Sequence, residues 1–247
     1  MRSSKVAVVT GASAGIGTAT ANALSRAGFR LLLGARREDR LSAVAEPLAA
    51  TAIRLDVTDP ASVERFAAAC PDCIDLLVNN AGAALGVDRI EELREDLWRQ
   101  MWETNVLGLA RLTKALLPML RRSPAAHIIN IGSIAGFETY LGGAGYTASK
   151  HALRAVTRTL RLELLGEPIR VTEINPGLVE TEFSIVRFDG DEARARAVYE
   201  GMTPLNGEDV ADCVVWAATR PLHVNIDEIV VRPRDQATAT RVHRTVS

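Results

Sequence analysis

Tyr146 and Lys150 stand four positions apart in the segment GYTASKH (145–151), with only small residues between them. Positions i and i+4 share one face of a helix, so the phenol and the ammonium would point the same way. A free phenol titrates at about 10, too high for acid or base work at neutral pH unless a nearby cation favours the phenolate. The spacing therefore predicts that Tyr146 is a general acid or base whose pKa is lowered by Lys150.

Ser133 ends a predicted strand, AHIINIGS (126–133). Its hydroxyl could hold a substrate oxygen while Tyr146 gives or takes a proton. Such a set suits the interconversion of an alcohol and a carbonyl. A lone Tyr/Lys pair at this spacing is more often a surface pair, so the hypothesis needs a site for a hydride carrier.

A glycine-rich turn, TGASAGIG (10–17), lies between the first predicted strand and the first predicted helix. Glycines there let a pyrophosphate approach the backbone N–H groups at the start of the helix. The spacing differs from GxGxxG, and a tight turn without a ligand is the alternative. In this context we predict a dinucleotide site that contains Gly11, Ser13, Gly15, Ile16 and Gly17. We then expect hydride transfer between a nicotinamide and the substrate carbon, with Lys150 also holding the nicotinamide ribose.

The second predicted strand ends in LLLGARREDR (31–40), where NAD-binding proteins usually carry an acidic residue. Ala35 stands there instead, followed by Arg36 and Arg37. Guanidinium groups bind a 2′-phosphate, which a carboxylate would repel. We therefore expect NADP(H); two solvated arginines are the alternative.

The third predicted strand ends in LDVTD (55–59). Asp56 is placed to read the adenine amino group, and Val57 to pack on the ring. Asp56 could instead cap the next helix, but Asp59 is the better candidate for that cap.

The elements that carry these residues alternate along the chain. Strands are predicted at 5–11, 29–36, 51–57, 74–82, 126–133, 169–177 and 225–233, and helices at 15–28, 37–49, 59–70, 91–122, 146–165 and 207–219. Strands that are apolar on both faces belong to a parallel sheet covered by helices on each side. We predict one α/β Rossmann domain over 1–247, with a doubly wound, mostly parallel seven-stranded sheet. Ligands should lie at the carboxyl ends of its strands.

Composition excludes several other classes of protein. A net charge of −1 gives no general attraction to nucleic acid or anionic membranes. Three cysteines cannot form a disulfide framework, and CPDC (70–73) has neither a second pair nor a neighbouring histidine pair for a metal site. We expect no metal, no membrane span and a cytoplasmic location.

Taken together, these motifs resemble the classical short-chain dehydrogenase/reductase family along essentially the whole chain. The matching residues are Thr10, Gly11, Gly15, Ile16 and Gly17, Asp56, NNAG at 79–82, Asn105, Ser133, Tyr146, Lys150, and PG at 176–177.

This resemblance implies further roles. Asn105 would bend its helix and hold a water that relays protons from Lys150. Asn79 and Ala81, with Gly82 of the same motif, would line the adenosine side. Contacts to the nicotinamide amide and the diphosphate would come from Pro176, Gly177, Val179 and Thr181. The family likeness also implies a homodimer or homotetramer through the long helices at 92–122 and 146–165.

Within the family, the segments 173–191 and 223–236 resemble the NADP-dependent 3-hydroxy acid dehydrogenases, which include serine dehydrogenases. The expected substrate is thus a 3-hydroxy acid such as serine or 3-hydroxypropionate. A reductase of an aldehyde or a 3-oxoacyl thioester is the alternative, and a non-catalytic NADP sensor a distant one.

The polar stretch 180–206 is interpreted as a substrate lid, with a helix at 189–200 and hinges at Gly190 and Gly201. Arg187 in this lid could pair with a substrate carboxylate; a solvated arginine is the alternative. Arg158, Arg161 and Arg170 are interpreted as solvated.

Overall fold

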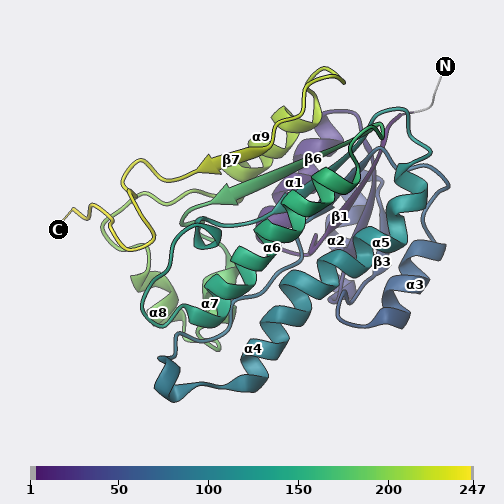
Figure 1. Ribbon diagram of the computed structural model, residues 1–247. Helices are drawn as coiled ribbons and strands as arrows, with labels where there is room; N and C mark the ends of the chain where they lie inside the picture. The colour runs from purple at the N-terminus through teal and green to yellow at the C-terminus, as the bar shows by residue number, and fades with distance from the viewer. Residues whose placement is uncertain (1–3, 246–247) are drawn as a thin grey trace.

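The computed structural model describes residues 4–245 and arranges them as a central sheet with helices on both faces (Figure 1). The strands are β1 (Val6–Thr10), β2 (Arg30–Ala35), β3 (Thr51–Arg54), β4 (Leu76–Asn79), β5 (Ala126–Ile131), β6 (Ile169–Pro176) and β7 (Glu228–Val231). The helices are α1 (Gly15–Arg26), α2 (Glu38–Ala45), α3 (Pro60–Ala68), α4 (Glu95–Trp102), α5 (Leu109–Leu120), α6 (Ala144–Glu163), α7 (Glu182–Arg187), α8 (Glu192–Ala197) and α9 (Gly207–Ala218).

The strand order in the sheet is β3-β2-β1-β4-β5-β6-β7, and every neighbouring pair is parallel. This confirms the predicted seven-stranded, doubly wound sheet. The winding direction reverses between β1 and β4, where a crevice forms at the carboxyl ends of the strands. In Figure 1 the arrowheads of β6 and β7 point toward the end of the molecule that carries α7 and α8.

Alternate residues of β1 enter different hydrophobic cores, because successive side chains of a strand point to opposite faces. Ala7 and Val9 pack with residues of α1, α2 and α9. Val6 and Val8 pack with residues of α3 and α5 and with Leu164, just beyond α6. Burial on both faces explains why the strands read as continuous apolar runs.

The long helix predicted at 91–122 is interrupted. α4 and α5 are joined by a π-helical turn, Glu103–Gly108, which contains Asn105. A Cβ on Gly108 would lie 2.7 Å from a methyl of Val57, so this turn packs tightly against the segment that follows β3. Single π turns are often found at functional sites.

The stretch 180–206 contains two short helices, α7 and α8. α8 covers only part of the helix predicted at 189–200, and α7 was not predicted. Thr181 caps the start of α7, since its hydroxyl accepts a hydrogen bond from Phe183 N. Gly190 and Gly201 have φ values of +88° and +70°, a conformation that favours glycine. Their role as hinges stays a prediction.

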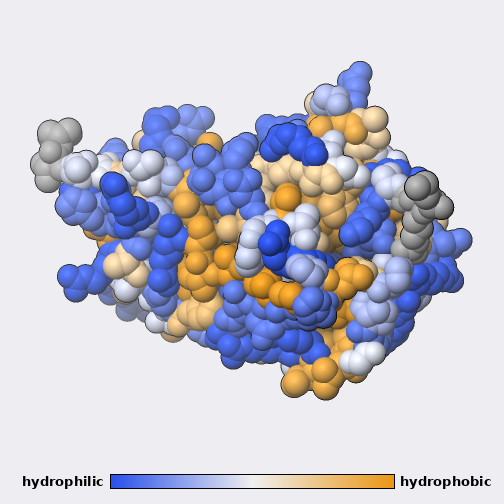
Figure 2. All heavy atoms as spheres, turned by 90° about the horizontal axis from the view of Figure 1, so that it is seen from above, coloured by the Kyte–Doolittle hydropathy of each residue, from blue (hydrophilic) through white to orange (hydrophobic). Residues whose placement is uncertain are grey.

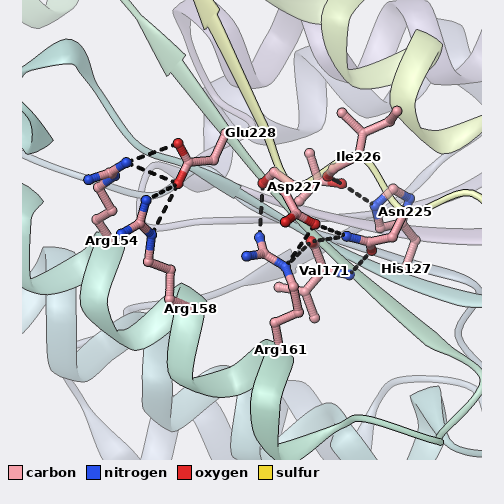
Figure 3. A network of polar contacts seen from close by, with 10 residues as sticks. His127, Arg154, Arg158, Arg161, Val171, Asn225, Ile226, Asp227 and Glu228 are labelled. Atoms are coloured by element: carbon pink, nitrogen blue, oxygen red, sulfur yellow. Dashed lines mark hydrogen bonds and ion pairs between the residues drawn. The ribbon is translucent and has the colours of Figure 1, made fainter.

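α6 is fixed to the sheet by arginines that bind the start of β7 (Figure 3). Arg154 and Arg158 share the carboxylate of Glu228, with Nη2–oxygen distances of 3.0 Å. Arg161 Nη2 donates to the carbonyl oxygen of Asp227 at 2.9 Å. Arg158 is paired but stays exposed, as its interpretation as solvated requires. That interpretation is wrong for Arg161, whose side chain is only 24% exposed, because β7 returns to α6 from the far end of the chain.

Arg170 is also engaged. Its Nη2 donates to the carbonyl oxygen of Ala218 at 3.2 Å, at the end of α9. A cation there is favoured by the helix dipole, so Arg170 joins β6 to α9 and is not solvated either.

Hydrophobic residues remain exposed on parts of the surface. Figure 2 shows them grouped among hydrophilic ones on the upper side, where Figure 1 places α9 and β7. Exposed members of these elements and of their connection are Trp216, Leu222 and Val230. Within residues 4–245, none of the helices has the length and apolar character needed to span a bilayer.

Candidate active site

A cavity of about 690 Å³ lies at the carboxyl ends of the strands. It is lined by residues that follow β1 to β6 and by the α7–α8 segment. The predicted site residues on its wall are Gly11, Ser13, Gly15, Ile16, Arg36, Arg37, Asp56, Val57, Ala81, Gly82, Ser133, Tyr146, Lys150, Pro176, Gly177, Val179, Thr181 and Arg187. The structure thus brings together most of the set, whose members are spread over the first 187 positions.

The turn before α1 has the shape that a pyrophosphate requires. Gly11 and Gly15 have φ values of +64° and +51°, which glycine adopts without strain. A Cβ on Gly17 would lie 2.3 Å from the carbonyl oxygen of Gly11. Gly17 therefore allows α1 to begin against the turn and does not itself line the cavity. The bare N–H groups at this helix start fit a dinucleotide pyrophosphate.

Asn79 is not on the cavity wall, which corrects the expectation that it lines the adenosine side. Its buried amide donates to Thr113 Oγ1 at 3.0 Å and to Asn130 Oδ1 at 2.9 Å. Asn80 lines the cavity instead, and its Nδ2 donates to the carbonyl oxygen of Thr10 at 2.8 Å. The alternation of side chains along β4 could have distinguished Asn79 from Asn80 in the sequence. Asn79 lies on the same face of the strand as Leu77, which is buried in the core.

Cations and two carboxylates meet at the end of the cavity predicted to hold the adenosine. Arg37 Nε and Nη2 lie 3.4 Å from Ser13 Oγ, and Arg37 Nη1 pairs with Glu182 at 2.8 Å. Burial opposes ionisation of Asp56, but hydrogen bonds from Thr58 and the charges of Arg36 and Arg54 lower its pKa. An ionised Asp56 can accept a hydrogen bond from an adenine amino group.

Tyr146 and Lys150 lie in the first turns of α6 and face the same cavity. Lys150 Nζ is 5.8 Å from the centroid of the Tyr146 ring and donates to the carbonyl oxygen of Ile131 at 2.9 Å. Ser133 N is held by Asn175 Oδ1 at 3.0 Å, and Ser133 Oγ accepts from Ala135 N at 3.1 Å. The residues predicted to perform the chemistry are therefore together.

The pKa values of this pair differ from the prediction. Burial raises the pKa of Tyr146, and the nearby Tyr140 raises it further, while Ser133 and Arg187 only partly offset these effects. Burial also lowers the pKa of Lys150 to about 8. The predicted lowering of the Tyr146 pKa by Lys150 is wrong for the polypeptide, because both groups are desolvated and the ammonium is directed at a backbone carbonyl. At neutral pH the phenol keeps its proton and can act as an acid.

A dinucleotide would be held here by the glycine turn, by Arg36 and Arg37 and by Asp56. When bound, it would supply the hydride donor or acceptor and, in its oxidised form, positive charge that favours the phenolate.

Asn105 lies behind the cavity wall and connects two parts of the site. Its Oδ1 accepts from Ala83 N at 2.8 Å, and its Nδ2 donates to Ala83 O at 2.8 Å and to Ser149 Oγ at 2.9 Å. Ser149 Oγ in turn donates to the carbonyl oxygen of Tyr146 at 2.8 Å. Asn105 thus joins the loop after β4 to the turn of α6 that carries Tyr146 and Lys150. Its water-holding role stays a prediction.

Arg187 reaches the catalytic end of the cavity from the end of α7. Its Nη2 donates to Tyr140 Oη at 2.9 Å, and its Cζ lies 5.8 Å from the centroid of the Tyr146 ring. The side chain is half-buried, and no carboxylate pairs with it among the described residues. The alternative of a solvated surface arginine does not describe this position.

Several lining residues were missed by sequence reasoning. Phe183 places its ring edge-on to Tyr146, with centroids 5.9 Å apart. Gln236, from the segment after β7, accepts a hydrogen bond from Leu178 N at 2.8 Å. Neither residue carries a local signal, because their contacts join segments that are distant in the sequence.

A model of the short chain dehydrogenase family matches residues 5–191, in the part of the chain that carries the glycine turn, Ser133, Tyr146 and Lys150. The chain belongs to the short-chain dehydrogenase family. It is therefore an oxidoreductase.

Relatives of this short-chain dehydrogenase match it over nearly its full length. A Mycobacterium tuberculosis protein described as an oxidoreductase is 58% identical over 237 residues, which cover 96% of this chain and 94% of the relative. The NADP-dependent 3-hydroxy acid dehydrogenase of Schizosaccharomyces pombe is 41% identical over 250 residues, covering 97% and 96%. A solved closed form of serine dehydrogenase complexed with NADP+ is 40% identical, with a TM-score of 0.92, and covers 97% of this chain and 100% of that one.

Proposed function

We propose that this short-chain dehydrogenase uses NADP(H) to interconvert the alcohol and carbonyl forms of a small carboxylate-bearing substrate, such as serine or 3-hydroxypropionate. The similar 3-hydroxy acid dehydrogenase and serine dehydrogenase both act on compounds with a carboxylate, and the names of both matches include NADP. The observation that carries the proposal is the position of Arg187.

The cavity is positively charged near Tyr146. Arg187 lies on its wall, 5.8 Å from the phenol ring centroid, with no carboxylate partner among residues 4–245. The acidic residues on the described wall are Asp56 and Glu182, and both interact with arginines of the adenosine end. A half-buried guanidinium favours an anionic group, which it can bind through two parallel hydrogen bonds.

The polypeptide groups divide the remaining work. In the reduction direction Tyr146 would donate its phenol proton to the substrate oxygen. Ser133 would hold that oxygen with its hydroxyl, and Lys150 would hold the nicotinamide ribose. The segment 180–206 would act as the substrate lid of a single domain.

The substrate proposal is tested with matched pairs of compounds. NADP-dependent oxidation of 3-hydroxypropionate is compared with that of its methyl ester, and NADPH consumption is followed with neutral aldehydes and a 3-oxoacyl thioester. We expect Arg187→Ala to raise KM for the acid by about tenfold or more and to leave KM for the ester nearly unchanged, since a charged hydrogen bond contributes about 1.5–3 kcal/mol. Arg194→Ala is the control, because Arg194 packs on Phe188 in the same segment and does not line the cavity. Equal turnover of acid and ester would contradict the proposal, and turnover of neutral carbonyls only would favour an aldehyde or thioester reductase.

The cofactor preference is tested separately by binding. Arg36→Ala should raise the Kd of NADPH, measured by nucleotide fluorescence, by at least tenfold and that of NADH by less than twofold, because only NADPH carries a 2′-phosphate. Equal losses for the two nucleotides would refute the assignment of Arg36.

We also infer that the protein is a homodimer or homotetramer through α4, α5 and α6. Trp102 at the end of α4, Leu107 in the π turn and Leu162 near the end of α6 are exposed. Light scattering of Leu162→Glu should show a smaller mass than the wild type; an unchanged mass would argue against this surface. The cytoplasmic location stays a prediction.

A further inference from the structure

α7 is fastened at both of its ends. Its first residue, Glu182, pairs with Arg37 at 2.8 Å and with Arg40 at 2.7 Å. Its last residue, Arg187, is held through Tyr140 Oη and through the backbone of Gly86, whose N–H donates to Arg187 O at 3.0 Å. The ion pairs of Glu182 join segments that lie more than 140 positions apart in the sequence.

Between these ends, α7 and the residue before it follow the wall of the cavity. A Cβ on Gly15 would lie 3.1–3.6 Å from three side-chain atoms of Thr181, so the start of α7 sits on the glycine turn. One residue beyond Glu182, Phe183 packs against Tyr146. The segment therefore reaches from the glycine turn to the phenol of Tyr146 along the wall of the cavity.

The two arginines that bind Glu182 have different surroundings. Arg37 lines the cavity and also faces Ser13. Arg40 lies one turn further along the chain, in α2, and does not line the cavity. Within residues 4–245, its ion pair is with Glu182 alone. Hydrogen bonds from Arg40 and Arg37 outweigh partial burial and lower the pKa of Glu182, so its carboxylate is charged at neutral pH.

We propose that Glu182 is a positioning residue that, with Arg37 and Arg40, forms a latch holding α7 over the cavity. These ion pairs must separate before a dinucleotide can enter or leave. The latch itself is independent of the reaction; its effect on nucleotide exchange rests on the proposed function.

Limited digestion with trypsin of the protein without nucleotide tests the latch directly, since Arg187, Arg194 and Arg196 offer cleavage sites in and beside α7. Glu182→Gln, which loses two exposed ion pairs, should be cleaved there about three- to tenfold faster than wild type. Arg40→Gln, which loses one, should be cleaved about two- to fivefold faster. Glu200→Gln is the matched control, because it removes the same charge from the same segment and Glu200 forms no ion pair among the described residues. In 1 M NaCl the Debye length is about 3 Å, so the ion pairs of Glu182 are screened. Wild type and Glu200→Gln should then be cleaved at equal rates, and both rates should approach that of Glu182→Gln. Cleavage of Glu182→Gln at the wild-type rate in low salt would overturn the proposal.

Stopped-flow displacement of bound NADPH tests control of nucleotide exchange. Arg40→Gln should release NADPH about two- to fivefold faster than wild type, although Arg40 is not on the cavity wall. Release at the wild-type rate would show that α7 does not limit exchange. A protein that bound neither NADPH nor NADH would contradict the proposed function, while the trypsin comparison would still decide the latch.

Discussion

The buried ammonium of Lys150 should make the stability of this protein rise with pH. Lys150 is 6% exposed, and burial lowers its pKa from 10.5 to about 8. One pKa unit corresponds to about 1.36 kcal/mol, so the charged form lowers the free energy of unfolding by roughly 3 kcal/mol.

The sign follows from where the proton is bound. Below pH 8 the folded and unfolded chains both carry the ammonium, and the full cost of burying it is present. Between pH 8 and 10.5 the folded chain has released the proton while the unfolded chain keeps it, so the free energy of unfolding increases with pH. From pH 7 to pH 9 the increase due to Lys150 is about 1.4 kcal/mol.

Urea unfolding at pH 7 and pH 9, followed by tryptophan fluorescence without nucleotide, measures this increase. The increase in the free energy of unfolding from pH 7 to pH 9 should be about 1.4 kcal/mol smaller in Lys150→Met than in wild type. Lys150→Met also leaves the carbonyl oxygen of Ile131 without its donor, which alters the stability at every pH. The change between the two pH values is therefore compared, and not the stability at one pH. Lys114→Met is the control, since Lys114 is exposed on α5. If Lys150→Met and wild type changed equally with pH, the assigned pKa of Lys150 would be refuted.

Variants at three other positions test individual contacts. Tyr146→Phe should lower kcat about 10²–10⁴-fold, the usual contribution of a positioned acid or base, with the Kd of NADPH unchanged; wild-type turnover would exclude the phenol from proton transfer. Asn105→Ala should lower the free energy of unfolding by about 2–4 kcal/mol, because its loss leaves the backbone N–H and carbonyl of Ala83 without their partner and Ser149 Oγ without its donor; a loss below about 0.5 kcal/mol, the usual effect of an exposed substitution, would contradict this. Asp59→Ala should cost about 1 kcal/mol in urea unfolding, since Asp59 Oδ1 accepts from Ala61 N at the start of α3, and Asp59→Asn should restore most of it.

The architecture of the sheet was predictable because each strand carries its own signal. Residues 6–9 are apolar on both faces, and burial on both faces is what a central parallel strand requires. The turn at 10–17 and the cap at Asp59 are likewise local: their conformations are determined by residues within a few positions. Tyr146 and Lys150 could be paired from the sequence because helical periodicity alone places them on one face.

The remainder depends on contacts between distant segments. Glu182 meets Arg40 across 142 positions, and Arg158 meets Glu228 across 70. Solvation of Arg161 and Arg170 was a reasonable prediction that tertiary contacts overturned, whereas Arg158 is paired and still exposed. The pKa of Tyr146 was mispredicted for a related reason, since spacing gives the distance to a cation but not the extent of desolvation around both groups.

The π turn at Glu103–Gly108 has a consequence for changes in chain length. A π turn closes with one residue more than an α turn, because its hydrogen bonds run from i to i+5, so the extra residue is absorbed within the turn. If the same residues became regular α-helix, in which each residue turns the chain by about 100°, α5 would rotate by about that amount relative to α4. Leu112, Leu116 and Leu120, now buried against the sheet, would then move toward water. Removal of one residue as the turn becomes regular would leave their direction unchanged, so this segment should tolerate a single-residue deletion better than a single-residue insertion.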